Sequence, residues 1–136
     1  MLLKFLAKYR DAGLLFMRFG LGVTFIMHGL PKLTGGPATW RGIGQAMGNI
    51  GIHQWPEFWG FLAAVTEGLG GVLLVMGAFF RPACLLLGFT MAMATVQLMS
   101  DAKTRDFKTY SHPLKMAVVF VGLAFIGPGR FSIDKD

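Results

Sequence analysis

The feature that most constrains this chain is a set of four long apolar blocks. They cover residues 12–30, 58–80, 83–99 and 114–126. A helix needs about 20 mostly apolar residues to cross the hydrocarbon core of a bilayer; the fourth block is short for a full crossing. One small domain could not bury all four blocks in a single core. The sequence therefore predicts an all-α fold, an integral membrane four-helix bundle, as a single domain over residues 1–136.

Composition and charge agree with a lipid environment. Hydrophobic residues make up 54% of the chain and charged residues 15%, whereas a soluble domain carries about a quarter charged residues. The net charge is +6 and the basic residues flank the apolar blocks, so we expect the lipid bilayer as partner and no nucleic acid. The single cysteine, Cys84, excludes an internal disulfide and a Cys-rich metal site, and no metal site is expected.

The connections predict how the spans follow one another. Pro31 is expected to disturb or end the first helix. Residues 40–52 have apolar side chains at near-helical spacing, which predicts a short helix at the membrane surface. Residues 80–82 predict a tight turn between antiparallel second and third spans. Ser111 is predicted to cap the fourth helix, with Pro113 in its first turn.

Four spans place both termini on the same side of the membrane. Lysine and arginine are evenly divided between the two sides, so the positive-inside rule does not choose an orientation from the count alone. The first helix usually dominates, and it is preceded by Lys4, Lys8 and Arg10. We therefore expect a multi-pass protein with its termini in the cytoplasm.

Two ionisable residues inside the predicted spans are candidates for function, because a charge in the hydrocarbon core is costly. Arg18 lies in the first span and Glu67 near the middle of the second. We expect them to form a buried charge pair. One interpretation is a structural ion pair that locks two helices; the other is an acid tuned by a pocket of low dielectric constant.

A polar stripe on the first span adds candidates. His28 and Lys32 are four residues apart and share a helix face with Arg18, so this face is expected to point into the bundle. The rise along each helix predicts one cavity in the outer half of the bundle. Its expected wall consists of Thr24, His28, Glu67, Thr95 and Gln97, and its expected mouth of Lys32, Asp101, His112 and Lys115. Such a pocket suits a small anionic or quinone-like ligand.

Three segments together resemble the DoxX family of small four-helix bacterial membrane proteins. They are MRFGLGVTFIMHGLPKL in the first span, TEGLGGVLLVMGAFFRPAC in the second and GPGRFSIDKD at the end. The resemblance covers nearly the whole chain and implies a four-helix bundle in the bacterial inner membrane. The family is named after a subunit of a thiosulfate:quinone oxidoreductase, and other members are linked to oxidative stress, thiol balance and quinone or catechol resistance. The absence of a Cys pair here argues against direct dithiol chemistry.

The residues and the resemblance predict a redox-linked accessory protein that binds a quinone or a small sulfur or anionic species. It would be at most a subunit of a quinone-linked oxidoreductase, with no intrinsic cofactor. Arg18 and Glu67 would tune the pocket and His28 would carry a proton or bind the ligand. The residues expected to attract an anion are Lys32, His112 and Lys115.

Two alternatives remain open. One is a non-enzymatic scaffold or assembly subunit that contacts membrane redox partner subunits. The other is a carrier for a small solute or a proton, which would need a homo-oligomer because four short helices enclose only a narrow path.

Overall fold

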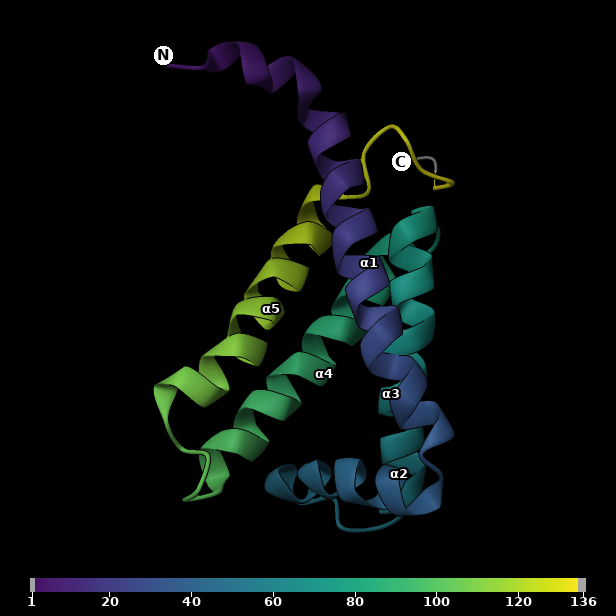
Figure 1. Ribbon diagram of the computed structural model, residues 1–136, viewed down its shortest axis with the longest axis vertical. Helices are drawn as coiled ribbons and strands as arrows, with labels where there is room; N and C mark the ends of the chain where they lie inside the picture. Colours follow the sequence, from purple (N-terminus) through teal and green to yellow (C-terminus); the bar gives the residue numbers. More distant parts are fainter. Residues whose placement is uncertain (1, 135–136) are drawn as a thin grey trace.

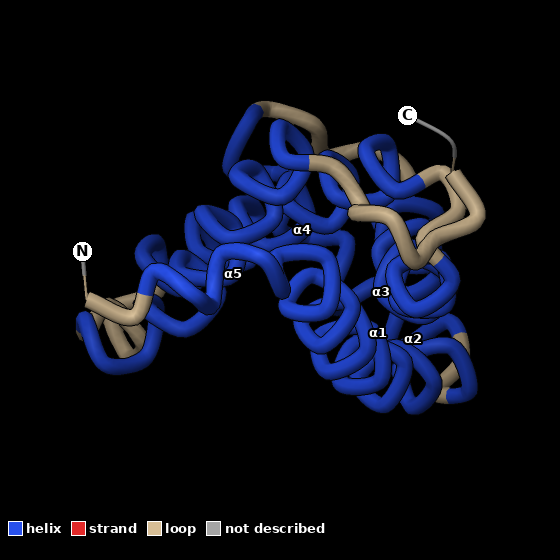
Figure 2. The backbone as a smooth tube through the Cα atoms, turned by 90° about the horizontal axis from the view of Figure 1, so that it is seen from above, coloured by secondary structure: helices blue, strands red, loops and turns tan. Residues whose placement is uncertain are grey.

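The computed structural model describes residues 2–134, which form helices joined by short connections (Figure 1). In chain order the elements are the 3₁₀ helix η1 (Lys4–Tyr9), α1 (Arg10–Thr34), α2 (Pro37–Gly44), the 3₁₀ helix η2 (Gln45–Ile50), α3 (Pro56–Met76), α4 (Phe80–Ser100) and α5 (Phe107–Ile126). No strand occurs among the residues described (Figure 2). Within residues 2–134, four segments are long and apolar enough to cross a membrane: η1 with α1, α3, α4 and α5. The predicted all-α membrane bundle is confirmed.

Two antiparallel helix pairs, α1–α3 and α4–α5, make up the bundle and diverge toward the end that carries α2 (Figure 1). Glycines let α1 and α3 approach very closely, as small residues do between membrane helices. A Cβ atom on Gly22 would lie 2.5 Å from the carbonyl oxygen of Gly71, and one on Gly29 would lie 2.4 Å from the amide nitrogen of Gly68. These contacts leave no room for larger residues and set the rotation of α1 against α3.

The apolar core lies nearer the end of the bundle where both termini are found. Leu74, Phe80 and Leu87 are completely buried there. Farther along, the rings of Phe25 and Phe120 meet edge to face with centroids 5.1 Å apart and join the two helix pairs. Beyond this contact the pairs separate, which leaves space between α3 and α4 near α2.

Two predicted boundaries in the first three spans are wrong. Pro31 does not end the first helix, which continues to Thr34. A proline removes one backbone donor, and the close packing of α1 on α3 holds the last turn in place. The turn between α3 and α4 was predicted at residues 80–82 but consists of residues 77–79, with Gly77 and Phe79 at φ +70° and +46°. Residues 80–82 form the first turn of α4, where proline is tolerated.

The fourth span is longer than the predicted 114–126. Asp106 caps α5, because its side chain accepts a hydrogen bond from the backbone nitrogen of Lys108. Ser111 and Pro113 therefore lie inside the helix rather than at its start. With 20 residues, α5 is long enough for a full crossing.

The helical segment predicted over residues 40–52 is present as α2 and η2, and it begins earlier, at Pro37. It crosses the start of α3 at the lower end of the bundle (Figure 1). A Cβ atom on Gly60 would lie only 1.6 Å from the carbonyl oxygen of Trp40, so the two backbones are in direct contact. The Trp40 indole donates to the carbonyl oxygen of Lys32 at 2.9 Å and ties α2 to the end of α1.

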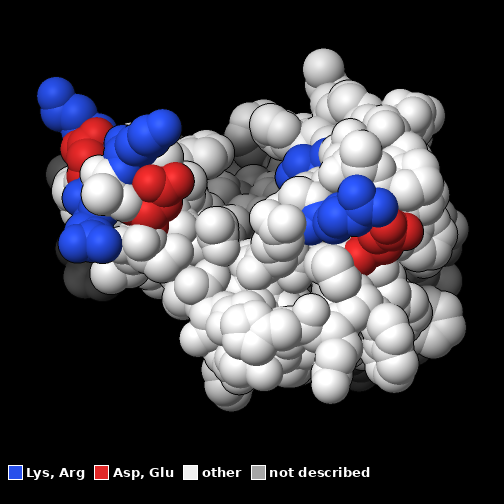
Figure 3. All heavy atoms as spheres, turned by 90° about the horizontal axis from the view of Figure 1, so that it is seen from below, with Lys and Arg blue, Asp and Glu red and all other residues white. Residues whose placement is uncertain are grey.

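Seen from below, this end carries two separate groups of charged side chains with a hollow between them (Figure 3). Arg41 of α2 and Glu57 of α3 form one exposed ion pair. The connection between α4 and α5 supplies further charges over residues 101–106. Because such charges are costly in hydrocarbon, they place this end of the bundle at the water and headgroup boundary.

Candidate functional site

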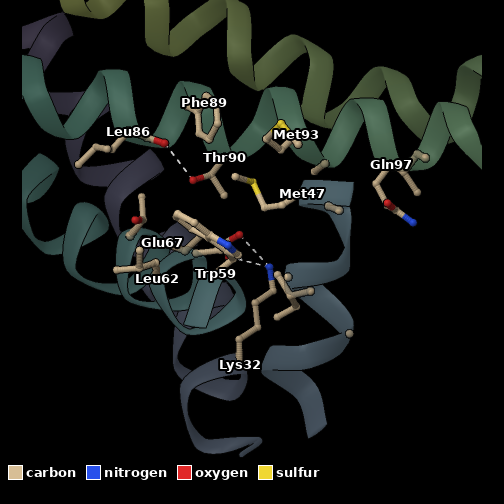
Figure 4. Close-up of a pocket in the computed structure, with 18 residues that line it drawn as sticks. Lys32, Met47, Trp59, Leu62, Glu67, Leu86, Phe89, Thr90, Met93 and Gln97 are labelled. Carbon is tan, nitrogen blue, oxygen red and sulfur yellow. Dashed lines mark hydrogen bonds and ion pairs between the residues drawn. The ribbon is translucent and has the colours of Figure 1, made fainter. Parts of the chain in front are cut away.

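A cavity of about 540 Å³ lies where the helix pairs diverge, between α3 and α4 and against α2 and η2 (Figure 4). Its volume falls in the range typical of sites for small organic ligands. Most of its lining is apolar. The side chains that line it include Lys32, Ile43, Met47, Trp59, Leu62, Ala63, Thr66, Glu67, Leu86, Phe89, Thr90, Met93, Ala94 and Gln97.

One ion pair stands on the wall of this cavity. The Lys32 ammonium lies 2.8 Å from both carboxylate oxygens of Glu67 (Figure 4). The Glu67 side chain is only 4% exposed and that of Lys32 is 36% exposed. Charge-assisted hydrogen bonds of this kind are strong, and the pair makes this part of the cavity the most polar.

The contact between α1 and α3 positions this pair. Gly29 touches the backbone of Gly68, the residue after Glu67. Lys32 lies nearly one turn beyond Gly29 on α1, so its side chain reaches the Glu67 carboxylate across the same interface. The Trp40 indole holds the carbonyl oxygen of Lys32 from the other side. Three elements therefore hold the pair in place.

A second polar contact lies beside the cavity at its lower end. The side-chain amide of Asn49 on η2 donates to the Gln97 side chain on α4 at 2.8 Å. This bond links the surface segment to the α4–α5 pair across the space between the two helix pairs. On the α4 wall, the Thr90 hydroxyl donates to the carbonyl oxygen of Leu86 within its own helix and keeps its oxygen available as an acceptor for a ligand.

Three of the seven candidate residues from the sequence line this cavity, namely Lys32, Glu67 and Gln97. Thr24, His28 and Thr95, predicted for its wall, do not line it, and neither do Asp101, His112 and Lys115, predicted for its mouth. Neighbouring residues on a helix are turned by about 100°. Since Gly29 faces α3, His28 points away and is exposed, with its ring at the edge of the Phe25 ring. His112 and Lys115 are exposed on α5.

The expected pair between Arg18 and Glu67 is wrong. Arg18 is 1% exposed, and its guanidinium donates to four backbone carbonyl oxygens. These belong to Leu74 at 3.0 Å, Val75 at 2.9 Å, Pro128 at 2.9 Å and Phe131 at 2.7 Å. The last carbonyl groups of a helix have no partner within it, so the end of α3 and the chain after α5 offer acceptors that suit the five donors of arginine. Arg18 therefore has a structural role at the opposite end from the cavity.

The C-terminal tail, residues 127–134, folds back over the ends of α1 and α3 (Figure 1). Its Asp134 accepts hydrogen bonds from the backbone nitrogens of Phe79 and Phe80 at 2.9 and 2.8 Å. Asp11 at the start of α1 accepts one from the backbone nitrogen of Arg130 at 3.1 Å. The tail thus joins three helices, and no local pattern in the sequence predicts these distant partners.

Several cavity residues were missed in the sequence, although a signal for them exists. Trp59, Ala63 and Thr66 follow one another at helical spacing on the face of α3 that also carries Glu67. On α4, Phe89, Met93 and Gln97 repeat every four residues. If the helix faces that carry Glu67 and Gln97 had been extended along α3 and α4, both walls of the cavity would have been identified.

Comparison with known proteins gives a consistent set of relatives. The DoxX family model matches residues 13–99. The inner membrane protein YphA of Escherichia coli (strain K12) is 30% identical over an alignment 140 residues long, gaps included. The alignment covers 94% of this chain and 96% of the relative. The inner membrane protein YqjF of the same strain is 30% identical over 129 residues and 94% of each chain.

A further relative, CatD of Bacillus subtilis (strain 168), is provisionally described as an oxidoreductase. It is 34% identical over 127 residues, which cover 93% of this chain and 88% of CatD. No solved structure matches the chain significantly.

Proposed function

Because the chain belongs to the DoxX family and is a multi-pass protein of the bacterial inner membrane, we propose that it is a redox-linked accessory protein that binds a quinone. The observation that carries this proposal is an apolar cavity with one Lys–Glu pair on its wall, of which the carboxylate is buried. The description of the relative CatD as an oxidoreductase supports a role in redox chemistry. Electrons would be exchanged with a separate membrane redox protein.

The lining of the cavity supports a quinone as its ligand. A flat apolar ring fits between the α3 wall with Trp59 and the α4 wall with Phe89 and Met93. The Lys32 ammonium has three donors, of which two are directed at the Glu67 oxygens, and the third is available for a ring carbonyl oxygen. Glu67 neutralises the ammonium charge, so the site favours a neutral quinone over a small sulfur-containing or other free anion.

A direct binding measurement tests this proposal. The purified protein in lipid nanodiscs is equilibrated with a radiolabelled ubiquinone analogue that has a decyl tail, and bound ligand is counted. We expect saturable binding, weakened about tenfold by Lys32→Met, because the loss of one hydrogen bond to a charged group costs about 1.5 kcal/mol or more.

Two tryptophan variants separate the cavity from the lipid-facing surface. Ala63→Trp fills the cavity and is expected to abolish binding. Val118→Trp places the same side chain on α5 at a position that is 66% exposed, and it is expected to bind normally. Circular dichroism and size-exclusion chromatography show that each variant is folded. The proposal fails if binding is not saturable or if Ala63→Trp binds like the unmodified protein.

We also propose that both termini face the cytoplasm. The supporting observation is the basic start of the first membrane segment, in which Lys4, Lys8 and Arg10 are exposed. Fusions of green fluorescent protein and of alkaline phosphatase to the C-terminus test this orientation. Fluorescence without phosphatase activity is expected, and the reverse result would contradict the proposal.

A further inference from the structure

The cavity faces the outside of the bundle between α3 and α4. Leu62, Leu86 and Phe89 line it, yet they are 39%, 57% and 52% exposed. The high exposure of three lining side chains shows that the cavity is not sealed from its surroundings. In Figure 4, Leu62 on one helix and Leu86 and Phe89 on the other flank the same side of the cavity. We call the gap between these three side chains the lateral opening.

The depth of the lateral opening places it in the hydrocarbon core. Leu62 lies six residues from the lower end of α3, which is about 9 Å along the axis at 1.5 Å per residue. Leu86 lies six residues from the upper end of α4, again about 9 Å. Both helices have 21 residues, which spans about the thickness of the hydrocarbon core. The lateral opening therefore meets lipid chains rather than water.

The route from water is polar and only partly covered, because Gly42 and Gln97 also line the cavity and are exposed. Ile43 of α2 and Met47 of η2 cover the cavity on the side of the connections. The hydrogen bond between Asn49 and Gln97 joins η2 to α4 across the same side. A ligand that came from water would pass the polar side chains of Lys32 and Gln97, whereas a molecule in the bilayer meets only apolar side chains at the lateral opening.

We propose that the cavity is loaded sideways from the bilayer through the lateral opening, and that its ligand is a quinone with a long isoprenoid tail. This inference rests on the proposed function. The ring lies beside Lys32 and Glu67, and the tail runs out between Leu62 and Phe89 into the surrounding lipid. The tail moves from one hydrocarbon environment to another, so it adds almost no binding free energy and its length is not limited by the cavity volume.

The dependence of affinity on tail length distinguishes this route from a closed site. The protein in nanodiscs is titrated with ubiquinone analogues that carry no tail, a decyl tail or a long polyisoprenoid tail. Dissociation constants are expressed as ligand per lipid. We expect them to agree within about threefold, because only the ring contacts the site. If the long-tailed analogue binds about tenfold more weakly than the tail-less one, the cavity encloses its ligand and lateral loading is wrong.

Photolabelling locates the tail directly. A ubiquinone analogue with a diazirine at the end of a decyl tail is bound, irradiated and mapped by mass spectrometry, with excess unlabelled analogue as competitor. We expect labelling of peptides that contain Leu62, Leu86 or Phe89, and we expect the unlabelled competitor to suppress this labelling. Competed labelling of Ala46 or Asn49 instead would show that the tail leaves toward water, which overturns this inference but not quinone binding. The absence of any competed labelling would overturn both.

Discussion

The Lys32–Glu67 pair predicts unequal costs for the loss of its two members. The Glu67 side chain is 4% exposed, so the change Lys32→Met leaves a buried carboxylate without its cation. The Lys32 side chain is 36% exposed, so after Glu67→Gln its ammonium extends toward water on its flexible stem. The new amide oxygen also still accepts a hydrogen bond. The lysine variant should therefore be much less stable than the glutamate variant.

The expected magnitudes follow from this burial. Removal of one partner from a fully buried pair costs about 3–5 kcal/mol, and the partial exposure of Lys32 reduces the expected cost of Lys32→Met to about 3 kcal/mol. Glu67→Gln is expected to cost about 1 kcal/mol, the size of one weakened hydrogen bond. The double variant removes both charges and should cost about 1–2 kcal/mol, because a buried neutral amide without a partner is much less costly than a buried unpaired carboxylate. The two changes should therefore be strongly non-additive.

Reversible unfolding in mixed micelles measures these costs. The free energy of unfolding is obtained from circular dichroism as the fraction of sodium dodecyl sulfate is raised. The exposed pair Arg41–Glu57 provides the matched control, since Arg41→Met and Glu57→Gln should each cost less than about 1 kcal/mol and should be additive. Equal costs for Lys32→Met and Glu67→Gln, or additive costs in their double variant, would refute the reasoning.

Two further predictions concern packing and the tail. Gly29→Val is expected to cost about 3 kcal/mol by the same unfolding measurement, because its Cβ atom would lie 2.4 Å from the backbone of Gly68. Gly20→Ala, which meets no atom within 4 Å, should be neutral or stabilising by up to about 1 kcal/mol; a comparable loss in both variants would contradict this account. Arg18→Met removes the guanidinium donors from four carbonyl oxygens, of which that of Leu74 still accepts from the backbone nitrogen of Gly77, and should lower stability by about 3–5 kcal/mol. It should also speed tryptic cleavage at Arg130, whereas an unchanged cleavage rate would show that the tail is held independently.

The overall fold could be predicted well because each span is recognisable by its own length and polarity. The misplaced boundaries arose where tertiary contacts or capping outweighed a single local signal. Packing against α3 carries α1 past Pro31, and Asp106 starts α5 before the predicted cap at Ser111. Asp106 is itself a favourable cap residue, so this second error could have been avoided from the sequence.

The candidate site was predicted only in part. Lys32, Glu67 and Gln97 were identified because polar residues stand out in apolar spans, and they line one cavity. Arg18 stood out for the same reason, but its partners are carbonyl groups, which every residue carries and which no sequence pattern distinguishes. His28 was expected beside them and instead lies on an exposed face of α1.

Membrane insertion depends on the transfer of each segment from water to hydrocarbon, a property summed over neighbouring residues. For that reason the amino-acid sequence was sufficient to predict a membrane protein with four spans and to identify its costly internal charges. The partners of those charges depend on how each helix is rotated and shifted against the next. Contacts such as Gly29 against Gly68 set that rotation. Only the folded chain therefore decided that Lys32 meets Glu67, that Arg18 holds the tail, and that a cavity opens between α3 and α4.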